Sequence, residues 1–123
     1  MDEGLIIDDN RQTADALNQM LGVLGFKARV AYGSSPAMEL LGTSFTPKFI
    51  CLDINMPGAD GTEILAYLKR EPRLMPVPVF VITSDDQPET RTKVMKLGAT
   101  AMLIKPATID AMETAFKTAK MLK

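Results

Sequence analysis

Two short apolar runs in this chain end in acidic residues, and a helical pattern follows each of them. Residues 5–7 (LII) are followed by Asp8 and Asp9, and residues 49–52 (FICL) are followed by Asp53. Strands that alternate with helices form parallel sheets, whose carboxyl ends meet at one edge. The three acids are therefore expected to lie close together. Because like charges repel, such a cluster indicates a site for a hard divalent cation.

Strand-like and helical patterns alternate five times along the chain. Apolar residues at three- and four-residue spacing, with proline or glycine near the ends, predict the helices. Continuous apolar runs predict strands that are covered on both faces. The expected strands are 4–7, 27–31, 49–52, 77–83 and 101–104; the expected helices are 11–24, 35–42, 61–70, 88–97 and 108 onward, with a turn at 55–58.

Five strand–helix units in 123 residues predict an α/β, doubly wound fold. We expect a flavodoxin-like, five-stranded parallel sheet in the order 2-1-3-4-5, with helices on both faces. The helical patterns also predict which side chains face inward. These are Thr13, Ala16, Leu17, Met20, Leu21 and Leu24 in the first helix, Met38 and Leu41 in the second, and Ile109, Met112, Phe116 and Ala119 in the fifth.

Composition excludes several classes of function. The chain is 46% hydrophobic and 24% charged, as in soluble globular proteins, and its net charge of −1 argues against a nucleic-acid surface. No apolar run approaches the roughly 20 residues that span a membrane, and the acidic start shows no secretory signal. The single cysteine, Cys51, cannot form an internal disulfide, so we expect a reducing, cytoplasmic location.

Two further polar groups, Thr83-Ser84 and Lys105-Pro106, end the expected fourth and fifth strands. Each polar group taken alone has an ordinary explanation, such as a helix cap, a turn or a solvated lysine. Those explanations do not account for the position that all of these polar groups share. The groups lie at the ends of strands one, three, four and five, which are neighbours in the expected order. The second strand, at the sheet edge, ends without such a group.

Together these residues resemble the receiver domain of bacterial response regulators, the phosphorylated half of two-component signalling. The resemblance covers essentially the whole chain. The motifs that carry it are, in order, residues 7–9 (IDD), 53–61 (DINMPGADG), 82–84 (ITS) and 105–106 (KP). It implies a switch that accepts a phosphoryl group, rather than an enzyme that turns over an external substrate.

The resemblance implies a role for each residue at the carboxyl ends of the strands. Asp53 is the expected phosphoacceptor, and Mg²⁺ is the expected cofactor. The expected metal site consists of Asp8, Asp9, Asp53 and the backbone carbonyl of Asn55, with Asp8 acting mostly through water. Lys105, the Thr83 hydroxyl and the Ser84 backbone N–H are expected to contact the phosphoryl oxygens.

Partners are also implied. The family receives its phosphate from a histidine on a partner, and this chain contains no histidine. We therefore expect transfer in trans from a histidine kinase or phosphotransfer protein, or from a small phosphodonor. Kinase docking is expected at Arg11, Ala14, Asp15, Asn18, Pro106 and Ala107. A downstream protein target is expected to bind the fourth helix, fifth strand and fifth helix, including Arg91, Lys93, Lys96, Glu113 and Lys117.

Two positions depart from the family pattern. The family commonly carries an aromatic switch residue shortly before the lysine, and Met102 aligns with that position. Met102 is either a core residue or a modified switch, because a flexible thioether does not need a two-position ring flip. Ala107 stands where phenylalanine is frequent, so this corner presents less apolar surface to a partner.

Alternative functions remain open from the sequence. The last helical pattern runs to residue 123, so we expect one domain, 1–123, acting as a single-domain regulator or phosphorelay intermediate; a receiver domain excised from a larger multidomain regulator is the alternative. An aspartate-nucleophile phosphohydrolase is disfavoured because Asn55 stands where a second aspartate would serve as general acid. A flavin carrier is disfavoured because the first loop presents two acids to a phosphate and the chain lacks tryptophan.

Overall fold

A parallel sheet forms the centre of the molecule in the computed structural model, which describes residues 3–56 and 58–122. In this part of the chain, five strands pair in the order β2-β1-β3-β6-β7. Counted along this sheet alone, that is the predicted order 2-1-3-4-5, and the prediction is confirmed. The strands are β1 (Gly4–Ile7), β2 (Ala28–Ala31), β3 (Ile50–Leu52), β6 (Val79–Thr83) and β7 (Ala101–Ile104).

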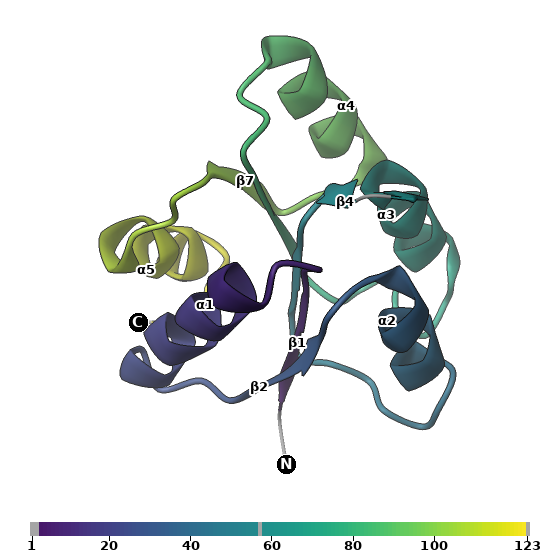
Figure 1. Cartoon of the computed structure of the whole chain (residues 1–123), viewed down its shortest axis with the longest axis horizontal. Coiled ribbons are helices and arrows are strands. Elements are labelled where there is room, and N and C mark those ends of the chain that lie inside the picture. The colour runs from purple at the N-terminus through teal and green to yellow at the C-terminus, as the bar shows by residue number, and fades with distance from the viewer. Residues whose placement is uncertain (1–2, 57, 123) are drawn as a thin grey trace.

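Helices cover both faces of the sheet, as a doubly wound fold requires. α1 (Arg11–Val23) and α5 (Ile109–Thr118) lie on one face, and α2 (Ser34–Leu41), α3 (Gly61–Arg70) and α4 (Pro88–Leu97) lie on the other (Figure 1). None of the helices in the described ranges combines the length and apolar character that crossing a membrane requires.

The strands are buried on both faces because successive side chains point to opposite sides. Ile6 and Phe80 join the core beneath α1 and α5, whereas Leu5 and Val81 join the core beneath the other three helices. Phe116 of α5 stacks on Phe80 with the ring centroids 4.3 Å apart. Burying a large apolar side chain contributes roughly 1.5–3 kcal/mol. The sheet is therefore a firmly packed support for the loops at its carboxyl edge.

A small hairpin, not predicted from the sequence, follows β3. β4 (Asn55–Met56) pairs antiparallel with β5 (Ala59–Asp60). The predicted turn at 55–58 forms part of this hairpin, and Pro57 lies outside the described residues. Gly58 has a φ of 73°, a left-handed conformation that glycine adopts readily. The hairpin brings Asp60 to the start of α3, where its carboxylate accepts a hydrogen bond from Thr62 N at 2.9 Å.

Three strands begin one or two residues later than predicted. β2 begins at Ala28, β3 at Ile50 and β6 at Val79. For β6 the reason is Pro78, which has no N–H to donate to a neighbouring strand. Pro78 still accepts, since its carbonyl receives a hydrogen bond from Ile50 N at 2.9 Å. The sheet pairing therefore starts at this proline.

Three side chains face differently from the sequence prediction. Ala16 and Ile109 are exposed, and Met38 is 37% exposed. Ala14 is fully buried in α1 instead of Ala16, and Ala37 is fully buried in α2 instead of Met38. An apolar arc on a helix is wide, so residue spacing alone does not decide which edge of the arc faces the sheet. The rotation of each helix is set by its packing.

Candidate functional site

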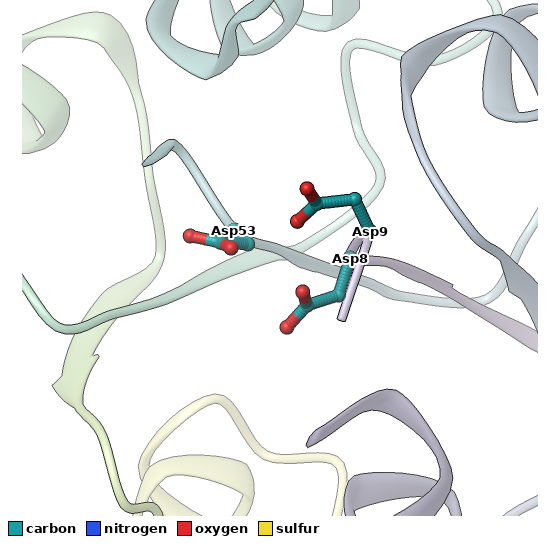
Figure 2. Close-up of side chains that lie close together, drawn as sticks. All are labelled: Asp8, Asp9 and Asp53. Carbon is teal, nitrogen blue, oxygen red and sulfur yellow. The ribbon is translucent and has the colours of Figure 1, made fainter. Parts of the chain in front are cut away.

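The three predicted acids gather at the carboxyl edge of the sheet. Parallel pairing places Ile7 opposite Leu52, so the residues that follow them are neighbours, and Asp53 N donates to Ile7 O at 3.0 Å. Asp8, Asp9 and Asp53 each offer a carboxylate oxygen within 4.8 Å of the others (Figure 2). Asp8 and Asp53 are buried, whereas Asp9 is exposed. The predicted cluster is thus present.

The two buried carboxylates are held in the same way. Asp8 Oδ1 accepts from Asn10 N at 2.9 Å, and Asp53 Oδ1 accepts from Asn55 N at 3.0 Å. Each carboxylate thereby accepts a hydrogen bond from the backbone N–H two residues later in the chain, a local turn that aspartate favours. The Oδ2 atoms of both carboxylates are directed to a third group, Lys105.

Lys105 bridges the two buried carboxylates. Its Nζ lies 2.9 Å from Asp8 Oδ2 and 3.2 Å from Asp53 Oδ2. The residue directly follows β7, and its backbone N–H donates to Thr83 O at 2.8 Å, so the end of the sheet positions it. One ammonium group therefore offsets part of the negative charge of the cluster.

The pKa values of Asp8 and Lys105 depend on two opposing effects: burial disfavours the charged form of each group, and the contacts between them favour it. Burial raises the pKa of the Asp8 carboxyl, although the hydrogen bonds from Lys105 and from Asn10 N oppose this change. Burial alone would lower the pKa of Lys105. The hydrogen bond to Asp8 and the negative charges of Asp53 and Asp8 outweigh burial, so the pKa of Lys105 is raised. The ammonium therefore stays charged.

The oxygen donors in this cluster fit a hard divalent cation. Carboxylate oxygens are the ligands that Mg²⁺ and Ca²⁺ prefer, and the cluster contains no sulfur or imidazole ligand to favour a softer ion. Asp9, on the exposed side, leaves the cluster open to solvent. An ion held by these residues would be open to water or to an oxygen of a reacting group.

Thr83 ends β6 beside this cluster. Its side chain is fully buried, and its Oγ1 accepts from Asn55 Nδ2 at 3.3 Å and from Asp85 N at 3.2 Å. The sequence pattern predicts Thr83 near the site, but it does not predict the link to Asn55. Ser84 follows at the same edge and is exposed. The structure therefore brings the predicted polar residues of four strands together.

Comparison with known proteins decides the family. Residues 5–117 match the family described as response regulator receiver domain. The chain belongs to this family. FilR2, a probable methanogenesis regulatory protein of Methanothrix harundinacea, is 27% identical over 113 residues, which cover 86% of this chain and 73% of FilR2. The transcriptional regulatory protein FixJ of Bradyrhizobium diazoefficiens is 30% identical over 115 residues, covering 93% of this chain and 54% of FixJ.

Solved structures show the same receiver fold. The signal receiver domain of a DNA-binding response regulator from Colwellia psychrerythraea has a TM-score of 0.89 and 29% identity, covering 98% of this chain and 99% of that one. A response regulator from Burkholderia pseudomallei, solved with a phosphorylated aspartic acid, calcium ion and citrate, has a TM-score of 0.84 and 25% identity, covering 98% of this chain and 71% of that one.

One predicted docking residue of this receiver domain is corrected by the structure. Ala14 is fully buried against the sheet, so it cannot contact a partner. Arg11 and Asp15 are exposed and Asn18 is partly buried. Of the residues after β7, Pro106 is exposed. The prediction was wrong because the rotation of α1 about its axis buries Ala14 and exposes Ala16, the reverse of what the residue spacing indicates.

A groove of about 470 Å³ lies between α1 and the segment after β7. It is lined largely by apolar side chains and reaches Lys105. Ala16 and Met20 fit the apolar spacing of the helix, which predicts them on its inward side, but both line this groove. The lining residues are Gln12, Thr13, Ala16, Leu17, Met20, Ile82, Lys105, Pro106 and Ala107.

Arg11 and Asp15, two of the predicted docking residues, both contact Tyr32. The sequence does not predict these contacts. The Arg11 guanidinium lies 4.1 Å from the centre of the Tyr32 ring, and Tyr32 donates its hydroxyl hydrogen to Asp15 Oδ1 at 2.6 Å. The hydrogen bond to Asp15 raises the pKa of Tyr32. Both side chains are thus held toward the end of β2, and neither lines the groove.

Met102, aligned with the aromatic switch position, is buried in the core beneath α4. The core-residue hypothesis predicts this placement. The Arg91 guanidinium crosses from α4 to the Met102 carbonyl at 3.5 Å. On the predicted output face, Lys93 and Lys96 are exposed, and the remaining pair, Glu113 and Lys117, lies 3.8 Å apart on α5.

Proposed function

We propose that Asp53 of this receiver domain accepts a phosphoryl group from a phosphohistidine on a partner protein, or from a small phosphodonor. The observation that supports this most strongly is the position of Lys105, whose ammonium contacts Asp53 and Asp8 at once. Asp53 Oδ2 is already paired with a cation that can follow a phosphoryl oxygen after transfer. The Burkholderia structure carries a phosphorylated aspartic acid on the same fold.

In the proposed transfer, a carboxylate oxygen of Asp53 forms a bond to phosphorus. The phosphorus–nitrogen bond of the donor breaks, and the departing imidazole nitrogen keeps the electron pair. The product is an acyl phosphate on Asp53. Lys105 then contacts a phosphoryl oxygen, and the Thr83 hydroxyl and the Ser84 backbone N–H supply further donors. The chain is modified once per cycle and does not turn over an external substrate.

Mg²⁺ is the proposed cofactor of this transfer. Asp9 and Asp53 would hold it directly with the Asn55 carbonyl, and Asp8 would act mostly through water. When bound, the ion neutralises charge on the transferring group. The oxygen-only cluster supports this assignment, since each acid offers an oxygen within 4.8 Å of the others.

The groove beside Lys105 is the proposed docking site for the histidine kinase or phosphotransfer protein. It opens next to the residue that contacts Asp53, so a bound partner lies near the phosphoacceptor.

The face formed by α4, β7 and α5 is the proposed contact for a downstream protein target. We propose that residues 5–117, which match the receiver family, act together as one receiver domain.

Incubation with acetyl phosphate tests the proposal. We expect the intact mass to rise by one phosphoryl group in the presence of Mg²⁺ and to remain unchanged with a chelator. Asp53→Asn should stay unmodified, whereas Asp15→Asn, which removes a carboxylate outside the cluster, should react like the wild type. Equal modification of wild type and Asp53→Asn would show that Asp53 is not the acceptor.

A further inference from the structure

The hydrogen bonds at Thr83 have a defined direction. Its hydroxyl oxygen accepts from Asn55 Nδ2 and from Asp85 N, at 3.3 Å and 3.2 Å. A hydroxyl group can accept two hydrogen bonds and donate one. With both acceptor positions used by N–H donors, the remaining hydrogen bond of Thr83 is its own O–H, which acts as a donor.

We propose that Asn55 is a positioning residue that keeps the Thr83 proton available to a phosphoryl oxygen on Asp53. This inference rests on the proposed function, because it concerns the state in which Asp53 is phosphorylated. A phosphoryl oxygen at neutral pH only accepts hydrogen bonds. Thr83 therefore binds it only by donating, and a neighbour that itself accepted the Thr83 proton would compete with the phosphoryl group.

The structure holds Asn55 where it can perform this role. Its backbone N–H donates to Asp53 Oδ1 at 3.0 Å, so the residue is anchored to the phosphoacceptor itself. Its backbone also pairs with Asp60 in the hairpin of β4 and β5. Asp60 in turn caps α3 through Thr62 N. The amide of Asn55 is thus supported from two sides while it reaches Thr83.

Substitution of Asn55 by aspartate separates hydrogen-bond direction from shape. Aspartate has nearly the same size as asparagine, but its ionised carboxylate has no N–H and only accepts. In Asn55→Asp the Thr83 hydroxyl donates to the new carboxylate and is lost to the phosphoryl group. The new negative charge also acts on the site directly, so the effect through Thr83 must be isolated by a double-mutant cycle.

The experiment measures the affinity for beryllofluoride, with Mg²⁺ present, by calorimetry. Four proteins form the cycle: wild type, Asn55→Asp, Thr83→Val and the double variant. Valine keeps the branched shape at this buried strand end and removes the hydroxyl. We expect Asn55→Asp to weaken binding by about tenfold more when Thr83 is present than when it is valine, the size of one hydrogen bond to a charged group. The direct charge effect is common to both backgrounds and cancels.

Thr83→Ser supplies the rescue arm, because serine restores a hydroxyl at the same position. The additional penalty of Asn55→Asp should return in the Thr83→Ser background, which a purely structural role would not produce. An equal factor in all three backgrounds would show that Asn55 acts without Thr83 and would overturn the inference alone. A wild type that binds no beryllofluoride would overturn the proposed function, and this inference with it.

Discussion

At the scale of single residues, the site depends on one lysine that holds two buried carboxylates. Asp8 and Asp53 are 3% and 5% exposed, and Lys105 contacts both. Removing one partner of a buried ion pair leaves an uncompensated charge, which costs several kcal/mol. The cluster is therefore stable when either the ammonium or a bound cation balances its charge.

Lys105→Met tests this balance. Methionine keeps a long, flexible side chain but removes the charge, so the two carboxylates repel each other. We expect the free energy of unfolding in a chelator to fall by about 2 kcal/mol, less than the roughly 3–5 kcal/mol for breaking a fully buried pair, because the Lys105 side chain is partly exposed. Added Mg²⁺ should recover part of this loss, as urea titrations would show. A loss of the same size with and without Mg²⁺ would contradict a shared charge balance.

Asp9→Asn tests the metal site without disturbing the core. Asp9 is exposed, so the substitution should change the stability of the metal-free protein by no more than about 0.5 kcal/mol. A ligand that binds the folded state stabilises it by about 2.7 kcal/mol at a hundred times its dissociation constant. The wild type should gain thermal stability with Mg²⁺, and Asp9→Asn should gain much less. Asp15→Asn, also exposed, is the control and should respond like the wild type.

At the scale of elements, Asp85 connects the end of β6 with the start of α4. Its backbone N–H donates to Thr83 Oγ1, and its carboxylate accepts from Gln87 N at 3.0 Å and from Thr90 Oγ1 at 2.7 Å. Thr83 is therefore hydrogen-bonded to the residue that holds the first turn of α4. These hydrogen bonds connect Thr83 with the start of α4, which belongs to the proposed output face, and they do not involve Met102.

Thr90→Val tests the link at α4 through its effect on pH dependence. The hydrogen bond from Thr90 lowers the pKa of Asp85, with help from Gln87 N. A folded-state pKa below that of the unfolded chain stabilises the fold above the unfolded-chain pKa, and this contribution is lost as the pH falls through the folded-state pKa. In Thr90→Val the carboxyl carbon resonance of Asp85 should titrate at higher pH than in the wild type. Thr92→Val, on the exposed side of α4, should leave that titration unchanged.

At the scale of the whole molecule, the fold and the site were predictable to different degrees. The strand order and the meeting of Asp8, Asp53 and Lys105 follow from parallel topology, which fixes where strand ends lie. The exchange of Ala14 and Ala16 was missed because residue spacing does not set the rotation of a helix. The hydrogen bonds of Thr83 depend on side-chain directions, which carry no sequence signal of their own.

A substitution in the groove between α1 and the segment after β7 tests whether a histidine kinase docks there. Ala16→Arg places a long charged side chain in this groove, whereas Gln19→Arg places one on an exposed part of α1 outside it. We expect Ala16→Arg to slow phosphotransfer from a histidine kinase that modifies the wild type by about tenfold or more, as for loss of a central contact. Modification by acetyl phosphate should be unchanged. Equal slowing by both variants would place the docking site elsewhere.

The central claim is that one particular carboxylate carries the phosphoryl group, and chemical trapping tests it most directly. Borohydride reduces an acyl phosphate of aspartate to homoserine, which marks the position permanently for peptide mass spectrometry. After treatment with acetyl phosphate and Mg²⁺, we predict homoserine at position 53 and at neither position 8 nor position 9, with the label lost when a chelator replaces Mg²⁺. Homoserine at position 8 or 9, or none anywhere in the protein, would contradict the account.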